Sequence, residues 1–197
     1  MILYLHGFRS SPQSAKARLT GARLAELGRA GPADFQCPQL PASPALAMEL
    51  AYALVDGVPA DQLAIVGSSL GGYYATAMAE RLGCRAVLLN PAIVPLQDLD
   101  RHVGVTTQFH SDEPFEFKRS YIEELRALAV PRISDPTRYF LIAATGDEVL
   151  DYRDMVAHYA GARQHVIAGS DHGISEYAEY VDAVLAFCGI DVAGGAA

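Results

Sequence analysis

The chain has 197 residues, of which 51% are hydrophobic and 19% are charged, so its composition is that of a globular protein rather than a disordered one. Its formal net charge of −8 disfavours binding to nucleic acids and to anionic membranes, because both partners favour basic surfaces. The length fits one domain, residues 1–197, with room for an inserted segment.

Short apolar runs alternate with helical patterns along the chain. The candidate strands are Ile2–Leu5, Phe35–Cys37, Leu63–Val66, Ala86–Asn90, Arg138–Ala144 and Gln164–Ala168, and the candidate helices are 14–28, 44–55, 70–82, 151–160 and 175–187. Ser14 and Ser43 are expected N-caps, and Pro44 occupies the first helical position that proline favours. This alternation predicts an α/β fold with a mostly parallel sheet of about six strands and helices on both faces.

Residues 97–136 differ in character from the rest of the chain. They carry clustered charges interleaved with Phe109, Phe115, Phe117 and Tyr121. We interpret them as an insertion or cap that follows the strand ending at Asn90. One helix is expected there, from about Phe117 to Leu128.

The most informative stretch is Gly67-Ser68-Ser69-Leu70-Gly71, which joins a buried strand to a helix. The pattern Gly67-x-Ser69-x-Gly71 is typical of a nucleophile elbow, in which a serine sits at the tip of a very sharp turn. Small residues are needed two positions before and after the serine because the backbone segments approach each other closely. Ser69 is therefore the candidate nucleophile, whereas Ser68 has the wrong spacing to the glycines.

A serine hydroxyl needs a neighbouring base, and functional groups in parallel sheets gather in the loops after the strands. Of the six histidines, His6 and His172 lie in such loops, whereas His102 and His110 lie in the cap, His158 in a helix and His165 at the start of a strand. His172 also follows Ser69 and an acid in the chain order that hydrolases require. We predict that His172 is the base and that His6 structures its loop.

The acid that orients the imidazole is predicted to be Asp147, which directly follows a strand and lies between Ser69 and His172 in the sequence. Glu148 and Asp151 are nearby alternatives that these residues alone do not exclude. Asp171 adjoins His172, but adjacent side chains rarely face each other in a loop.

Two backbone N–H groups are expected to form an oxyanion hole. One belongs to Leu70, directly after the nucleophile, and the other to Phe8, in the loop after the first strand.

Several motifs together resemble the YqiA-type esterases, a family of small bacterial α/β-hydrolases. They are Tyr4-Leu5-His6-Gly7-Phe8, Ser10-Ser11-Pro12, Ser14-Ala15-Lys16-Ala17, 67–76, Asn90-Pro91-Ala92, 145–152 and Asp171-His172. The resemblance implies a compact α/β-hydrolase fold that lacks the first strands of larger relatives. It also implies hydrolysis of esters or thioesters, with Ser69, Asp147 and His172 as the catalytic triad and Asp147 rather than Glu148 as the acid.

The sequence therefore predicts a serine esterase that acts on a small-molecule acyl ester through an acyl-enzyme, with no metal or cofactor. An acyl-CoA thioesterase or an acyltransferase is the alternative, since Arg9, Lys118 and Arg119 could meet a phosphate. A non-catalytic binding protein of the same fold is a further alternative.

A cytoplasmic location is expected from three features of the sequence. Cys37, Cys84 and Cys188 are widely spaced and show no disulfide or metal-ligand pattern. The first residues lack the basic segment and the long apolar run of a signal peptide. No stretch has the length and apolarity of a membrane-spanning helix.

Overall fold

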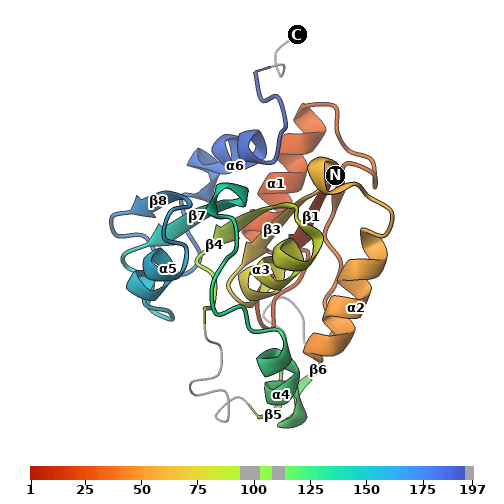
Figure 1. The fold of residues 1–197 in the computed structure, drawn as a ribbon, viewed down its shortest axis with the longest axis vertical. Helices are drawn as coiled ribbons and strands as arrows, with labels where there is room; N and C mark the ends of the chain where they lie inside the picture. Colours follow the sequence, from red (N-terminus) through yellow and green to blue (C-terminus); the bar gives the residue numbers. More distant parts are fainter. Residues whose placement is uncertain (94–102, 108–113, 194–197) are drawn as a thin grey trace.

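In the computed structural model, which describes residues 1–93, 103–107 and 114–193, six strands form one parallel sheet (Figure 1). From edge to edge the strands are β2 (Phe35–Gln36), β1 (Ile2–Leu5), β3 (Ala64–Ser68), β4 (Arg85–Leu89), β7 (Tyr139–Ala144) and β8 (Arg163–Ile167). Each neighbouring pair runs parallel. The predicted sheet is confirmed, and each strand lies within two residues of the expected bounds.

Helices cover both faces of the sheet (Figure 1). On one face lie α1 (Ala15–Glu26) and α6 (Val181–Phe187), and on the other lie α2 (Pro44–Leu54), α3 (Leu70–Leu82) and α5 (Tyr152–His158). Successive side chains of a strand point to opposite faces, so Ile2 and Tyr4 pack with α1 and α6 while Leu3 and Leu5 pack with α2 and α3. The short helix η1 (Ala60–Gln62) precedes β3.

The ends of two helices differ from the prediction. The expected closing helix 175–187 is broken into the 3₁₀ helix η4 (Tyr177–Glu179) and α6. Tyr177 is buried, and its hydroxyl lies 2.9 Å from Thr20 Oγ1 of α1, which anchors the chain at this break. Ser43 caps α2 by accepting from Leu46 N at 3.3 Å, but the Ser14 side chain makes no capping hydrogen bond.

The described part of the insertion contains an antiparallel pair, β5 (Gly104–Thr107) and β6 (Pro114–Phe117), and the helix α4 (Ser120–Ala127). The prediction of a helix from Phe117 is wrong at its start: Phe117 is a buried strand residue paired with Gly104, and the helix begins three residues later. Phe109, His102 and His110 lie outside the described residues.

Polar contacts attach α4 to the start of α2 and to α3. Glu124 Oε2 accepts from Ser43 Oγ at 2.7 Å and from Ala45 N at 2.9 Å, so its carboxylate caps the N-terminus of α2. Tyr73 of α3 donates its hydroxyl to the Leu125 carbonyl at 2.9 Å. This part of the insertion is therefore docked against two helices.

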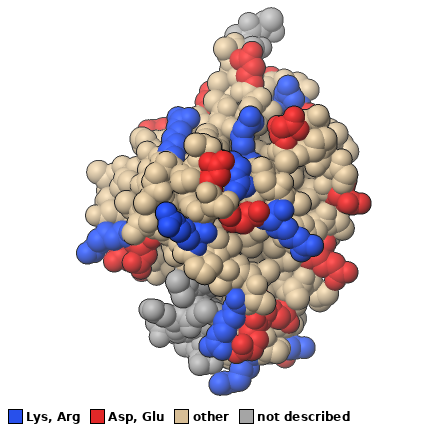
Figure 2. All heavy atoms as spheres, in the orientation of Figure 1, with Lys and Arg blue, Asp and Glu red and all other residues tan. Residues whose placement is uncertain are grey.

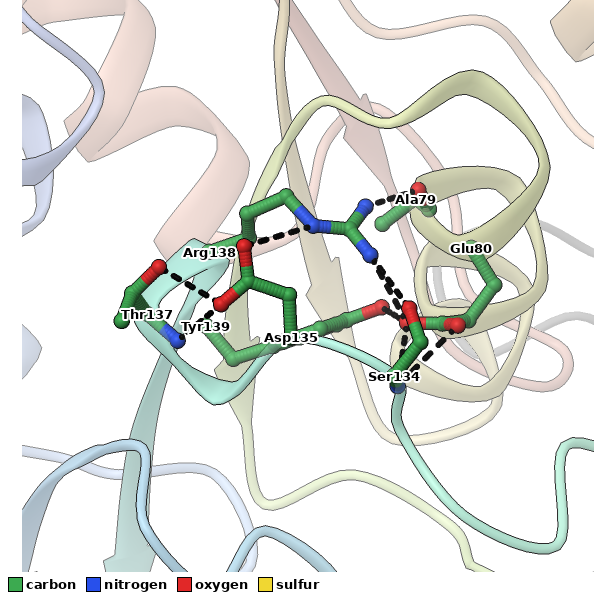
Figure 3. A network of polar contacts seen from close by, with 7 residues as sticks. All are labelled: Ala79, Glu80, Ser134, Asp135, Thr137, Arg138 and Tyr139. Carbon is green, nitrogen blue, oxygen red and sulfur yellow. Dashed lines mark hydrogen bonds and ion pairs between the residues drawn. The ribbon is translucent and has the colours of Figure 1, made fainter.

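A separate polar network ties the last turns of α3 to the start of β7 (Figure 3). Arg138, at the end of the 3₁₀ helix η3 (Pro136–Arg138), donates to the Ala79 carbonyl at 2.6 Å and to Glu80 Oε1 at 3.2 Å. The Tyr139 hydroxyl donates to the same Glu80 oxygen, and Ser134 N donates to the Glu80 carboxylate at 3.2 Å. The network lies at the amino ends of the strands, opposite the loops in which function is expected.

Figure 2 shows that acidic and basic side chains are interspersed on the visible face, without a large patch of one sign. No helix among the described residues combines the length and the apolar character needed to cross a membrane.

Candidate active site

Ser69 lies between β3 and α3 in a backbone conformation that side-chain-bearing residues rarely adopt, with φ 56° and ψ −122°. The two flanking glycines permit this turn. A Cβ on Gly67 would lie 2.3 Å from the Gly71 carbonyl oxygen, and a Cβ on Gly71 would lie 2.0 Å from the Leu5 carbonyl oxygen. The tight turn expected of a nucleophile elbow is thus present.

The loop after β1 packs against this turn. A Cβ on Gly7 would lie 3.1 Å from Ser69 Cβ, so Gly7 touches the candidate nucleophile and Phe8 follows directly. His6 is buried; its Nε2 accepts from Leu40 N at 3.0 Å, and its Nδ1 lies 3.0 Å from the Gly7 carbonyl. These contacts assign the proton to Nδ1 and give His6 the loop-structuring role that the sequence suggested. Leu70 is the first residue of α3, where backbone N–H groups lack intrahelical acceptors.

The structure brings His172 and Asp147 together. His172 Nδ1 lies 2.8 Å from Asp147 Oδ2, and the Asp147 side chain is fully buried while that of His172 is 21% exposed. The other carboxylate oxygen of Asp147 accepts from Val149 N at 2.8 Å and from Leu150 N at 2.9 Å. These bonds hold the carboxylate in one orientation, with Oδ2 directed at the imidazole.

The other carboxylates near this site have different partners. Glu148 Oε2 accepts from the backbone N–H of His172 at 3.0 Å, and Asp151 caps α5 by accepting from Arg153 N at 2.9 Å. Asp171 accepts hydrogen bonds from Ser175 N at 3.0 Å and from Ser175 Oγ at 2.6 Å. The pKa of Asp171 is lowered, mainly by the hydrogen bond from the Ser175 hydroxyl. Glu148 therefore contacts the main chain of His172, whereas Asp147 contacts its ring.

Asn90 is a residue of this site that sequence reasoning missed. It is fully buried directly after β4, and its Nδ2 donates to the carbonyls of Asp171 at 3.0 Å and His172 at 3.1 Å. Its Oδ1 accepts from Ala144 N at 2.8 Å. The available signal was a polar amide that directly follows four consecutive apolar residues, 86–89.

Lys16 also contacts the loop that carries His172, although no sequence pattern indicated this. Its Nζ donates to the Gly173 carbonyl at 2.6 Å, next to His172. Burial lowers the pKa of Lys16 to about 8, although the nearby carboxylates of Asp171 and Asp147 act in the opposite direction.

The insertion packs against the loop that carries Phe8. The Phe8 ring meets Phe115 edge-on with centroids 5.0 Å apart, and it meets Phe117 in the same way at 5.4 Å. Arg9 Nε donates to the Thr107 carbonyl at 2.7 Å, and Lys118 Nζ lies 3.5 Å from Glu116 Oε2. β5 and β6 thus pack against the loop after β1. The side chains of Arg9 and Lys118 both have polar partners in this segment.

Of the two other described histidines, His158 lies in a helix, α5, as expected, whereas His165 lies in the middle of its strand, β8, rather than at the start. His102 and His110 fall in the ranges that the structure leaves undescribed.

Comparison with known proteins agrees with this architecture. Similar solved structures include alpha/beta hydrolase domain-containing protein 10 from mouse, with a TM-score of 0.69 and 15% identity over 94% of this chain and 89% of that one. Est1E from Butyrivibrio proteoclasticus matches with a TM-score of 0.66 and 18% identity over 94% and 85% of the two chains. A monoacylglycerol lipase from Paleococcus ferrophilus matches with a TM-score of 0.65 and 15% identity over 98% and 94%. These likenesses establish the α/β-hydrolase fold.

The sequence itself matches the uncharacterised protein family UPF0227 across residues 1–189. This match covers almost the whole chain, including the elbow and the loops that carry Asp147 and His172. The chain therefore belongs to the UPF0227 family, the family of the YqiA-type proteins.

Proposed function

We propose that the protein is a serine esterase that hydrolyses carboxylic esters or thioesters through an acyl-enzyme. The observation that carries the proposal is the 2.8 Å contact between His172 Nδ1 and the buried Asp147 carboxylate. The fold and the strained elbow at Ser69 support it, as does the similarity of the fold to an esterase domain from Rhodothermus marinus and to a monoacylglycerol lipase.

The proposed reaction uses each residue in a separate role. The Asp147 carboxylate accepts a hydrogen bond from the Nδ1–H of His172, which keeps the proton on Nδ1 and leaves Nε2 free to remove the Ser69 proton. Ser69 Oγ then attacks the acyl carbonyl carbon, and the alcohol or thiol leaves with the proton from His172. Water, activated by His172, hydrolyses the acyl-enzyme and releases the acid.

The developing oxyanion is assigned to the backbone N–H groups of Phe8 and Leu70. Two features support the assignment: the loop after β1 touches Ser69 at Gly7, and Leu70 begins α3. The positive end of the helix dipole adds to the stabilisation of negative charge at this point.

Hydrolysis of p-nitrophenyl acetate by Ser69→Ala and Ser68→Ala tests the proposal with two adjacent serines. Loss of the nucleophile is expected to lower kcat by several orders of magnitude, about 10³-fold or more, whereas Ser68→Ala is expected to stay within about tenfold of wild type. Wild-type turnover by Ser69→Ala would overturn the assignment.

The same site could act on acyl-CoA or transfer the acyl group to another acceptor. Comparing acyl-CoA with simple esters of the same acyl group separates these activities from simple ester hydrolysis. We further propose that residues 1–197 act as one domain on a small-molecule acyl ester in the cytoplasm.

A further inference from the structure

We propose that Asn90 is a positioning residue that holds His172 in register with Asp147, an inference that rests on the proposed function. Asn90 is fully buried, and its carboxamide uses both of its ends. The Nδ2 group donates to the carbonyls of Asp171 and His172, and Oδ1 accepts from Ala144 N. The Asn90 side chain thus connects the loop that carries His172 to the last residue of β7, the strand that precedes Asp147.

The main chain around Asn90 extends the connection to the nucleophile. Asn90 N donates to the Ile142 carbonyl at 2.9 Å, and the preceding carbonyl, that of Leu89, accepts from Ser69 N at 3.0 Å. Asp147 N donates to the Ala144 carbonyl at 3.3 Å, and the N–H of the same Ala144 donates to Asn90 Oδ1. The acid is therefore one backbone turn from a residue that Asn90 binds. Hydrogen bonds of Asn90 and of its neighbour Leu89 therefore reach the segments that carry Ser69, Asp147 and His172.

Asparagine suits this position for two independent reasons. Its φ is 43°, in the left-handed region where asparagine and glycine are more readily accommodated than other residues. The side chain must also donate to two carbonyls and accept from one N–H, and among uncharged side chains a carboxamide offers both a double donor and an acceptor. Asn90 is the one asparagine of the 197 residues.

Two substitutions separate the amide from the backbone conformation. Asn90→Gly keeps a residue that tolerates the positive φ and removes the hydrogen bonds to His172 and Ala144. Asn90→Asp keeps the shape of the side chain and the oxygen that accepts from Ala144 N. It replaces the Nδ2 group, which donates to two carbonyls, with an oxygen that would face those carbonyls without a proton to donate. Glu80→Gln is the matched control, because it weakens the distant network at the start of β7 without touching the site.

The experiment measures kcat, KM, the melting temperature and the NMR signal of the His172 Nδ1 proton for wild type and the three variants. Both Asn90 variants are expected to lower kcat by about 10- to 100-fold, to change KM less, and to shift or remove the Nδ1 proton signal. Glu80→Gln is expected to lower the melting temperature and leave kcat and that signal unchanged. Asn90 variants with wild-type kcat and signal, whatever their melting temperature, would overturn the inference.

A measurement on wild type keeps the inference testable if the variants do not fold. Selective ¹⁵N-asparagine labelling gives a single side-chain amide, because the chain has one asparagine. That signal is expected to shift when a fluorophosphonate modifies Ser69, and an unchanged signal on a modified protein contradicts the inference. A wild type that neither reacts nor hydrolyses esters overturns the proposed function itself.

Discussion

His172 Nδ1 and Asp147 Oδ2 are 2.8 Å apart, although 25 positions separate the two residues in the sequence. The contact follows from the sheet, because β7 and β8 are parallel neighbours with Ala144 beside Ile167. Beyond these strands the two loops stay together: Gly146 N donates to the Gly169 carbonyl at 2.9 Å, and Gly169 N donates to Thr145 Oγ1 at 2.8 Å. The acid and the base are thus brought close by the pairing of their strands and by hydrogen bonds between the two loops.

Asp147→Asn tests which carboxylate supports the imidazole. An amide in place of the carboxylate favours the wrong tautomer of His172 and no longer stabilises its charged form, so kcat is expected to fall by about 10³- to 10⁴-fold. Asp151→Asn is the matched control, because asparagine caps a helix as well as aspartate does, and it should keep near-wild-type kcat. A larger loss in Asp151→Asn than in Asp147→Asn would reverse the assignment of the acid.

Gly71→Ala tests the close approach at the elbow. The added Cβ would lie 2.0 Å from the Leu5 carbonyl oxygen, so the backbone must shift, and unfolding free energy is expected to fall by about 3 kcal/mol or more. Gly31→Ala, whose Cβ would lie 3.3 Å from the terminal Asp34 Oδ2, should change it by about 0.5 kcal/mol or less. Chemical denaturation of both variants measures the difference; equal stabilities would mean that the elbow tolerates a side chain.

Acid sensitivity is expected to depend on the network of Glu80 (Figure 3). Burial acts to raise the pKa of Glu80, but the hydrogen bonds from Tyr139 and Ser134 and the charge of Arg138 outweigh it and lower that pKa. A lowered folded-state pKa means that the carboxylate stabilises the fold above its unfolded pKa, about 4.5, and that this contribution is lost as pH falls through the folded value.

Glu80→Gln should therefore reduce the unfolding free energy by about 1–3 kcal/mol at pH 7, with a smaller deficit at pH 3. Urea titrations of wild type and variant at the two pH values provide the measurement. A deficit that is equal at both pH values would show that the charge of Glu80 contributes nothing.

Phe115→Ala tests whether the insertion supports the loop that carries Phe8. The Phe115 ring packs directly on Phe8, whereas Tyr121 packs on Phe117, with centroids 5.6 Å apart. Loss of the direct support is expected to lower kcat/KM by about tenfold or more, because small displacements of an oxyanion donor are costly. Tyr121→Ala, which removes a ring one step further away, should retain more activity; the opposite ranking would contradict this coupling.

The core of the fold could be predicted because buried parallel strands are continuous apolar runs, as in Ile2–Leu5 and Tyr139–Ala144. The pair β5 and β6 could not be, because Gly104–Thr107 and Pro114–Phe117 are short, partly exposed and carry no such pattern. The sequence also predicts the start of α4 too early. Phe117 fits the helical spacing of the residues that follow, but it is the last residue of β6, and α4 begins at Ser120.

The placement of Asp147 beside His172 was predictable from chain order and strand ends, and the structure brings the two together. The parts played by Glu148 and Asn90 were not, because both act on backbone atoms of the His172 loop. Hydrogen bonds to a main chain leave no pattern in residue types, so they become visible only when the loop conformation is known.

The central claim is that Ser69 is a nucleophile activated by His172, and covalent labelling with a fluorophosphonate tests it most directly. Peptide mass spectrometry of the folded wild type is expected to find one phosphonyl group on Ser69. His172→Ala, folded to the same extent, is expected to react about 100-fold more slowly or worse. A folded wild type that stays unlabelled, or that carries the label on Ser68, would contradict the account.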